Sequence, residues 1–101
     1  MRLSDPQGMA LDGALLYVAD TDNNRIKRIT LRDSKVRTFA GTGQAGLREG
    51  PGGQATFDEP AGLSIAGGRL CVADTNNHRI RILDLDTAGV RTLRIRDLSS
   101  P

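Results

Sequence analysis

An internal repeat is the feature that most limits how this chain can fold. Residues 3–41 align with residues 57–95 at a constant offset of 54, without a gap, and 15 of the 39 aligned positions are identical. Such identity indicates one structural unit used twice, in a chain whose 101 residues suffice for one domain at most. We therefore expect units at 3–41 and 57–95, a glycine-rich connection at 42–56 and a C-terminal tail at 96–101.

Each unit contains four short stretches with the composition of β-strands, and turn residues such as Asp12-Gly13 and Gly67-Gly68 separate them. No window has a convincing helical period. The sequence therefore predicts an all-β protein in which each unit is a four-stranded antiparallel meander. The expected strands are 8–11, 15–19, 25–31 and 36–40 in the first unit, and 62–65, 69–73, 79–85 and 90–95 in the second.

The second expected strand of each unit, at 15–19 and 70–73, is apolar on both of its faces. A sheet with one wet face should instead alternate between apolar and polar residues. Sheets that are apolar on both sides need cover on both sides, and a row of similar sheets supplies it. That arrangement is the packing of blades in a β-propeller. The fourth strand of each unit is more polar, as expected for an outer edge.

The same polar turn follows the second strand of both units. An aspartate there can accept hydrogen bonds from N–H groups of the turn, and asparagine tolerates a left-handed backbone. Arg25 and Arg79 share one repeat position, which indicates a packed stem and a bond to a nearby carbonyl or carboxylate. The residues predicted to be structural in these turns are Asp20, Asn23, Arg25, Asp74, Asn77 and Arg79.

The sequence predicts no catalytic, cofactor-binding or metal-binding residues. Calcium needs about six to eight converging oxygens, and Asp20, Asp22 and Asp74 stand on separate units. Zinc sites draw on several His or Cys ligands, whereas His78 and Cys71 are the single residues of their types. We expect His78 to be a turn residue and Cys71 to be a buried structural thiol.

Residues 41–46 fit the pattern G-x-G-x-x-G of dinucleotide-binding loops. That pattern binds a pyrophosphate only where its glycines open a helix. The following residues, 47–53, contain Gly50-Pro51-Gly52-Gly53 and are unsuited to a helix. We therefore expect no nucleotide at this loop.

The repeated pattern resembles the NHL repeat. Each unit has Pro-x-Gly, then Val-Ala-Asp-Thr-x-Asn-x-Arg-Ile, and Asn77-His78-Arg79 stands at the place of the triplet that names the family. This resemblance implies blades of a six-bladed propeller, of which two form an incomplete ring. The stretch from Phe39 to Gly46 is most similar to the C-terminal blades of proteins that join a thioredoxin-like domain to an NHL propeller. The chain has no Cys-x-x-Cys, so the chemistry of that domain is not carried over.

Composition limits the partners. A net charge of +2 is too small for the electrostatic footprint of a nucleic-acid binder, and three aromatic residues offer few stacking platforms. No apolar run approaches the roughly 18 residues of a membrane span. The chain shows no signal-peptide pattern and has one cysteine, which favours the cytoplasm.

The expected function is a non-catalytic binding or scaffold module that contacts other proteins. One alternative is an RNA-binding surface, since Arg25, Lys27, Arg28, Arg79 and Arg81 recur on the third strands. The other is part of a propeller enzyme of the lyase or lactonase type, with its active-site residues in other blades. The open faces of two blades are expected to need further blades or self-association, and three copies could close six blades.

Overall fold

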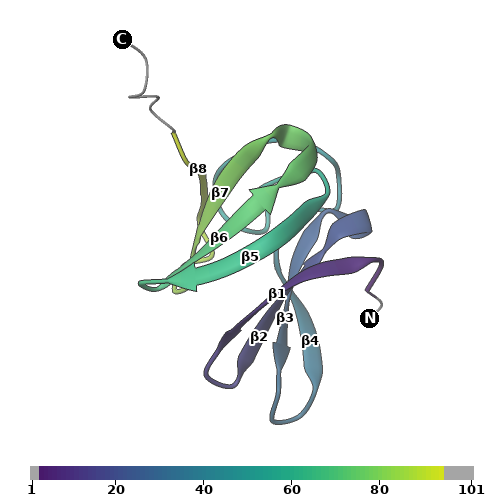
Figure 1. Ribbon diagram of the computed structural model, residues 1–101, viewed down its shortest axis with the longest axis vertical. Helices are drawn as coiled ribbons and strands as arrows, with labels where there is room; N and C mark the ends of the chain where they lie inside the picture. The colour runs from purple at the N-terminus through teal and green to yellow at the C-terminus, as the bar shows by residue number, and fades with distance from the viewer. Residues whose placement is uncertain (1–2, 95–101) are drawn as a thin grey trace.

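The computed structural model describes residues 3–94, which form two four-stranded antiparallel sheets. Figure 1 shows them as two fans that lie against each other, joined by the connection at 41–59. Blade 1 comprises β1 (Pro6–Asp12), β2 (Leu15–Asp20), β3 (Arg25–Thr30) and β4 (Lys35–Ala40). Blade 2 comprises β5 (Pro60–Ala66), β6 (Arg69–Asp74), β7 (Arg79–Asp84) and β8 (Val90–Thr92). The predicted all-β fold of two meanders is confirmed.

The strands of both sheets follow the chain in simple order, β1-β2-β3-β4 and β5-β6-β7-β8. Single 3₁₀ turns, Thr21–Asn23 and Thr75–Asn77, join the second and third strands. The expected strand at 90–95 is shorter in the structure, and Ile95 lies outside the described residues. Leu93 N–H still donates to the carbonyl of Ile80, so the chain stays beside β7 after the regular ladder ends.

The two copies have the same backbone shape. Within residues 3–94, six residues other than glycine have a positive φ, all between 52° and 63°, and they form three pairs at the repeat offset of 54. Positive φ is uncommon for residues with a Cβ, so its recurrence at matched positions reports one shared conformation. The pairs are Asp5 with Glu59, Asn24 with His78, and Ser34 with Ala88.

One hydrophobic core lies between the blades. β5 of blade 2 contacts β1 and β2 of blade 1. Tyr17 and Phe39 meet edge to face, with their ring centroids 5.1 Å apart, which is a favourable aromatic geometry. The buried core residues are Tyr17, Ala19, Ile26 and Ala40 of blade 1, Leu70, Val72, Leu83 and Val90 of blade 2, and Ala55 and Phe57 of the connection.

Each blade has one covered face and one face without a neighbour among residues 3–94. We call the open side of blade 1 its leading face; its apolar residues are Met9, Leu11, Leu16, Val18, Ile29 and Val36, and Lys27, opposite Val18, lies on the same side. We call the open side of blade 2 its trailing face; it consists of Gly62, Ser64, Cys71, Ala73, Ile80 and Ile82. Met9 is 68% exposed and Leu11 is 61% exposed.

Cys71 is half-buried, where the sequence predicted a buried thiol. The reason is its position on the trailing face, whereas its strand neighbours Leu70 and Val72 lie on the covered side and are fully buried. None of the elements within residues 3–94 is a helix of the length and apolar character that crossing a lipid bilayer requires.

Candidate functional site

The two 3₁₀ turns and both ends of the connection lie at one end of the blades, whereas the middle of the connection reaches the β7–β8 hairpin, where Gly50 pairs with Val90. The register places Asp20 opposite Pro6 and Asp74 opposite Pro60. Each turn therefore adjoins the start of the first strand of its blade, β1 or β5, which we call the inner strand. We call this end the turn face and define it as residues 20–25, 41–49, 55–59 and 74–79. The hairpins that join the first to the second and the third to the fourth strands lie at the other end, the hairpin end.

Asp74 is the centre of the turn face in blade 2. Its side chain is fully buried and accepts three hydrogen bonds. Oδ1 accepts the backbone N–H of Asp58 at 2.8 Å, while Oδ2 accepts Nδ2 of Asn77 at 2.8 Å and Nη1 of Arg81 at 2.7 Å. The Asp74–Arg81 contact is the one ion pair found within residues 3–94. A buried carboxylate with this many donors is fixed in place.

Arg81 joins the third strand of blade 2 to the connection. Its guanidinium is fully buried, and it donates from Nη1 to the carbonyl of Thr56 at 2.7 Å and from Nη2 to the carbonyl of Arg48 at 2.8 Å. It also lies 4.9 Å from the centroid of the Phe57 ring, within cation–π range. Nε has no hydrogen-bond partner among the described residues. The side chain therefore ties two distant points of the connection to β7.

The position of Arg81 follows from strand alternation. It pairs with Val72 across the ladder and shares the covered face with Leu83. A charged residue on a buried apolar face needs an opposite charge and hydrogen bonds, because desolvation would otherwise outweigh the packing. Asp74 supplies the charge and the connection supplies the carbonyls. Asn77 adds a further tie, since its Nδ2 donates to the carbonyl of Gly46 at 2.7 Å.

Blade 1 repeats the aspartate but not the ion pair. Asp20 is fully buried; its Oδ1 accepts the N–H of Ser4 at 2.6 Å and its Oδ2 accepts Nδ2 of Asn23 at 2.9 Å. Lys27 stands where blade 2 has Arg81, and its Nζ donates to Oγ1 of Thr38 at 2.7 Å. In both blades the N–H that Oδ1 accepts precedes the inner strand, whereas the sequence suggested an N–H of the turn itself.

Lys27 is buried without an ion-pair partner in the described part of the chain. Its burial lowers the pKa of the ammonium group, and the like charge of Arg25 lowers it further. The Asp20 carboxylate raises the same pKa and so opposes both effects. The charge of Lys27 is therefore less well accommodated than that of Arg81.

Arg25 and Arg79 differ although they share a repeat position. Nη2 of Arg25 donates to the carbonyl of Thr42 at 2.8 Å. Gly43 makes room for it, because a Cβ there would lie 2.6 Å from Nη2. Arg79 is exposed and its Nη1 donates at 3.2 Å to the carbonyl of the preceding residue, His78. The positions that correspond to Thr42 and Gly43 are 96 and 97, outside the described residues.

The structure thus brings Asp20 together with Asn23, and Asp74 with Asn77, while the two arginines of the prediction lie apart from these pairs. Residues 3–94 contain no group of three or more His, Cys, Asp or Glu side chains close enough to hold a metal ion. Residues 41–46 form a loop in which Ala45 bridges to Phe57, and no helix follows it.

Sequence reasoning missed Arg81 as the centre of this site. It grouped Arg81 with the other basic residues of the third strands. The signal was available, because Arg81 shares one face of the strand with Leu83 and Leu85, so its side chain had to lie among apolar neighbours. Lys27 has the same relation to Ile29 and Leu31.

The rim of the turn face carries exposed side chains of both signs. Glu49 accepts the backbone N–H of Thr92, and this hydrogen bond is the main cause that lowers the pKa of the Glu49 carboxyl. Acidic and basic groups are interspersed, so the rim has no extended field of one sign. The exposed polar side chains of the rim are Asp22, Gln44, Arg48, Glu49, Glu59, Thr75, Asn76, His78 and Arg79.

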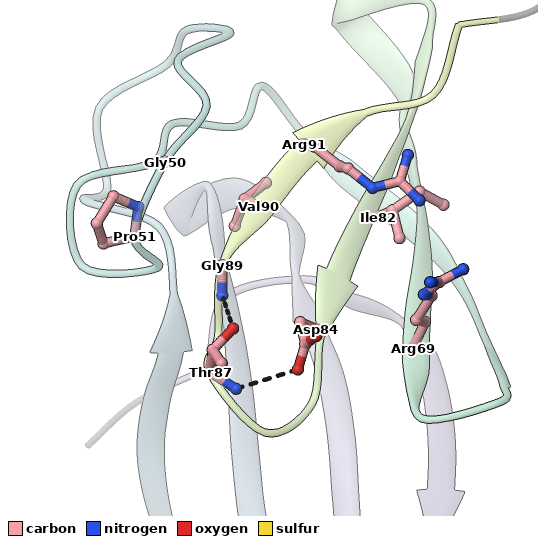
Figure 2. A pocket seen from close by; sticks show the side chains of 9 residues that line it. All are labelled: Gly50, Pro51, Arg69, Ile82, Asp84, Thr87, Gly89, Val90 and Arg91. Carbon is pink, nitrogen blue, oxygen red and sulfur yellow. Dashed lines mark hydrogen bonds between the residues drawn. The ribbon is translucent and has the colours of Figure 1, made fainter.

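A hollow of about 510 Å³ lies at the outer edge of blade 2, between its strands and the Gly50–Pro51 loop. Figure 2 shows Arg91 and Arg69 on either side of Ile82. Asp84 lies opposite Arg69 in the ladder but forms no ion pair with either arginine within residues 3–94, and its Oδ1 accepts the N–H groups of Asp86 and Thr87. The trailing face is therefore apolar toward the turn face and basic toward the outer edge.

Comparison with known proteins agrees with this geometry. The family model described as NHL repeat matches residues 3–29 and 57–83, which start before β1 and β5 and end one residue before the ends of β3 and β7. The chain belongs to the NHL-repeat family. NHL repeat-containing protein 2 of Bos taurus is 46% identical over 94 residues, which are 88% of this chain and 13% of the relative.

Two further relatives are similar to this chain. Protein SUPPRESSOR OF QUENCHING 1, chloroplastic, of Arabidopsis thaliana is 41% identical over 105 residues, covering 98% of this chain and 10% of the relative. B-box type zinc finger protein ncl-1 of Caenorhabditis elegans is 33% identical over 79 residues, covering 71% of this chain and 9% of the relative. The chain therefore spans a small part of the length of the relatives it matches.

Proposed function

We propose that this pair of NHL blades is a non-catalytic binding module that contacts a partner protein through the turn face. The observation that carries the proposal is that basic residues of the third strands are buried or hydrogen-bonded within the chain. Lys27 and Arg81 are buried at 4% and 0% exposure, and Arg25 is bonded to a carbonyl. The remaining rim offers mixed charges on a rigid frame, which suits a polar protein interface.

RNA binding is the second candidate, and the burial of the basic residues weakens it. An RNA site needs basic groups that release counterions when they meet phosphates, so its affinity falls steeply with salt. Binding of a mixed-sequence single-stranded RNA by the chain should be absent, or weak at every salt concentration. Tight binding with a steep salt dependence would favour the RNA function over the protein function.

A propeller enzyme of the lyase or lactonase type is the third candidate. The buried carboxylates of this chain, Asp20 and Asp74, are engaged in holding the turns, which leaves them unsuited to proton transfer with a substrate. Catalytic groups would then come from other blades of a longer protein. Stoichiometric zinc or calcium in such a longer protein would favour the enzyme.

A site-specific photo-crosslinker tests the proposal. We place it at Asn76, exposed on the turn face, and in a matched variant at Asp33, exposed at the hairpin end. The expected result is a defined set of proteins crosslinked from position 76 and missing from position 33. Equal capture from both positions, or capture of RNA from position 76, would contradict the proposal.

A further inference from the structure

The contacts between the two blades are built from residues that the repeat duplicates. Gly8 is buried, and a Cβ added to it would lie 1.8 Å from the carbonyl oxygen of Ala61 in β5. Neither Gly8 nor its counterpart Gly62 has a positive φ, so backbone conformation does not require glycine at either place. Glycine is required at position 8 because β5, the inner strand of blade 2, passes too close to leave room for a Cβ.

Gly62 is the counterpart of Gly8 in blade 2, but no strand within residues 3–94 packs against it. It is exposed, and the nearest atom to an added Cβ would be the Cβ of Ala73 at 3.6 Å, an ordinary contact. Residues 3–94 therefore give no steric reason for glycine at position 62. A strand that passed Gly62 as β5 passes Gly8 would supply that reason.

Thr75, at the turn of blade 2, also lacks the contact between blades that its counterpart in blade 1 makes. Thr21, its counterpart in blade 1, is 3% exposed and donates from Oγ1 to the carbonyl of Pro60 at 2.8 Å, across the junction between the blades. Thr75 is exposed, and its hydroxyl has no partner in the described part of the chain. The residue that would match Pro60 in an added strand is Pro6, which is identical.

The leading face has the same kind of residues as the face by which blade 2 packs against blade 1. Blade 2 contributes six aliphatic residues to its contact with blade 1. The leading face has an apolar residue at all six corresponding positions. In blade 2 these residues are Leu63, Ile65, Leu70, Val72, Leu83 and Val90, and their counterparts are Met9, Leu11, Leu16, Val18, Ile29 and Val36. The leading face of blade 1 thus has the same apolar pattern as the face by which blade 2 packs against blade 1.

From these matches we infer that the trailing face of blade 2 docks the leading face of blade 1 of a second copy of the chain. The carbonyl of Gln7, the counterpart of Ala61, lies against Gly62 in this junction, and Oγ1 of Thr75 donates to the carbonyl of Pro6. The contact is head to tail, so it propagates into a closed ring or a filament. This inference goes beyond the turn-face function and does not depend on it.

The charges and the shape of the two faces also fit. The hairpin end of blade 1 carries the exposed carboxylate of Asp33, and the same end of the trailing face carries Arg69. A hollow of about 300 Å³ beside Cys71 lies where blade 1 has the larger Tyr17. Met9, the counterpart of Leu63, brings a longer unbranched side chain to a face that has this room.

The test measures the molar mass of the full chain by light scattering over a range of concentrations. The wild type should assemble, and Gly62→Ala should remain monomeric with an unchanged circular dichroism spectrum, its dissociation constant raised by more than about tenfold. Gly53→Ala is the matched control, because an added Cβ there has nothing within 4 Å. It should assemble like the wild type.

Mixing two blocked variants distinguishes head-to-tail contact from other geometries. Leu11→Glu blocks the leading face and Gly62→Ala blocks the trailing face, so each variant should be monomeric alone. Mixed, they retain one intact junction and should form a 1:1 complex. A wild type that stays monomeric, a Gly62→Ala variant that assembles normally, or a mixture without complex would each overturn the inference.

Discussion

Blades 1 and 2 have one backbone shape but hold their turns by different means. In blade 2 the carboxylate of Asp74 meets the guanidinium of Arg81, which also binds two carbonyls of the connection. In blade 1 the carboxylate of Asp20 is held by neutral donors, and Lys27 bonds to Thr38. The comparison shows that the fold of a blade needs the buried aspartate and its asparagine, whereas the ion pair serves the connection between blades.

The largest expected difference between the blades comes from the same substitution at the two aspartates. Asp74→Asn leaves the buried guanidinium of Arg81 without a counter-charge, and breaking a buried ion pair in this way costs about 3–5 kcal/mol. Asp20→Asn weakens two hydrogen bonds and should lower the free energy of unfolding by about 1–2 kcal/mol. Urea unfolding followed by circular dichroism in dilute solution measures both. Equal losses would show that the two blades are held alike.

A smaller difference is expected for the two threonines of the turns. Thr21→Val removes a buried hydrogen bond across the junction and should lower the free energy of unfolding by about 1 kcal/mol. Thr75→Val changes an exposed side chain and should stay within about 0.5 kcal/mol of the wild type in the monomer. Thermal unfolding of dilute samples compares the pair. A loss at Thr75 as large as at Thr21 would contradict the assignment of the junction contact.

The smallest expected effect is a pH dependence that belongs to blade 1. The folded state lowers the pKa of Lys27 below its ordinary 10.5, so between the two pKa values the unfolded chain holds a proton that the folded chain has released. The contribution of Lys27 to stability therefore rises with pH in that window and is constant below it. Urea unfolding of wild type and Lys27→Met, compared from neutral pH to about pH 10, should show the wild type gaining relative to the variant. A relative loss would mean that the folded state raises this pKa.

Most of the fold could be predicted from the sequence because the repeat and its turns are local signals. The offset of 54 fixes two equivalent units, and Asp12-Gly13 and Gly67-Gly68 mark hairpins whose positions the structure reproduces. Strand alternation also placed Leu16 and Val18 on the face opposite to Tyr17, as the register shows.

The candidate site was less accessible, because its partners come from a segment without periodicity. The carbonyls of Arg48 and Thr56 lie 33 and 25 residues before Arg81, and no pattern in the connection indicates which carbonyls would face a strand. The burial of Arg81 itself could have been inferred from its parity with Leu83. The exposure of Arg79, in contrast to Arg25, depends on which segment lies beside each turn.

The central claim is that Arg81 holds the connection to blade 2, and hydrogen exchange of backbone amides in Arg81→Lys tests it most directly. This variant gives blade 2 the residue type of blade 1. The account predicts faster exchange of the bonded amides of Gly46, Gly50 and Thr56, with the amides of β1 to β3 unchanged. Unchanged exchange across residues 44–58, or an equal increase in both blades, would contradict it.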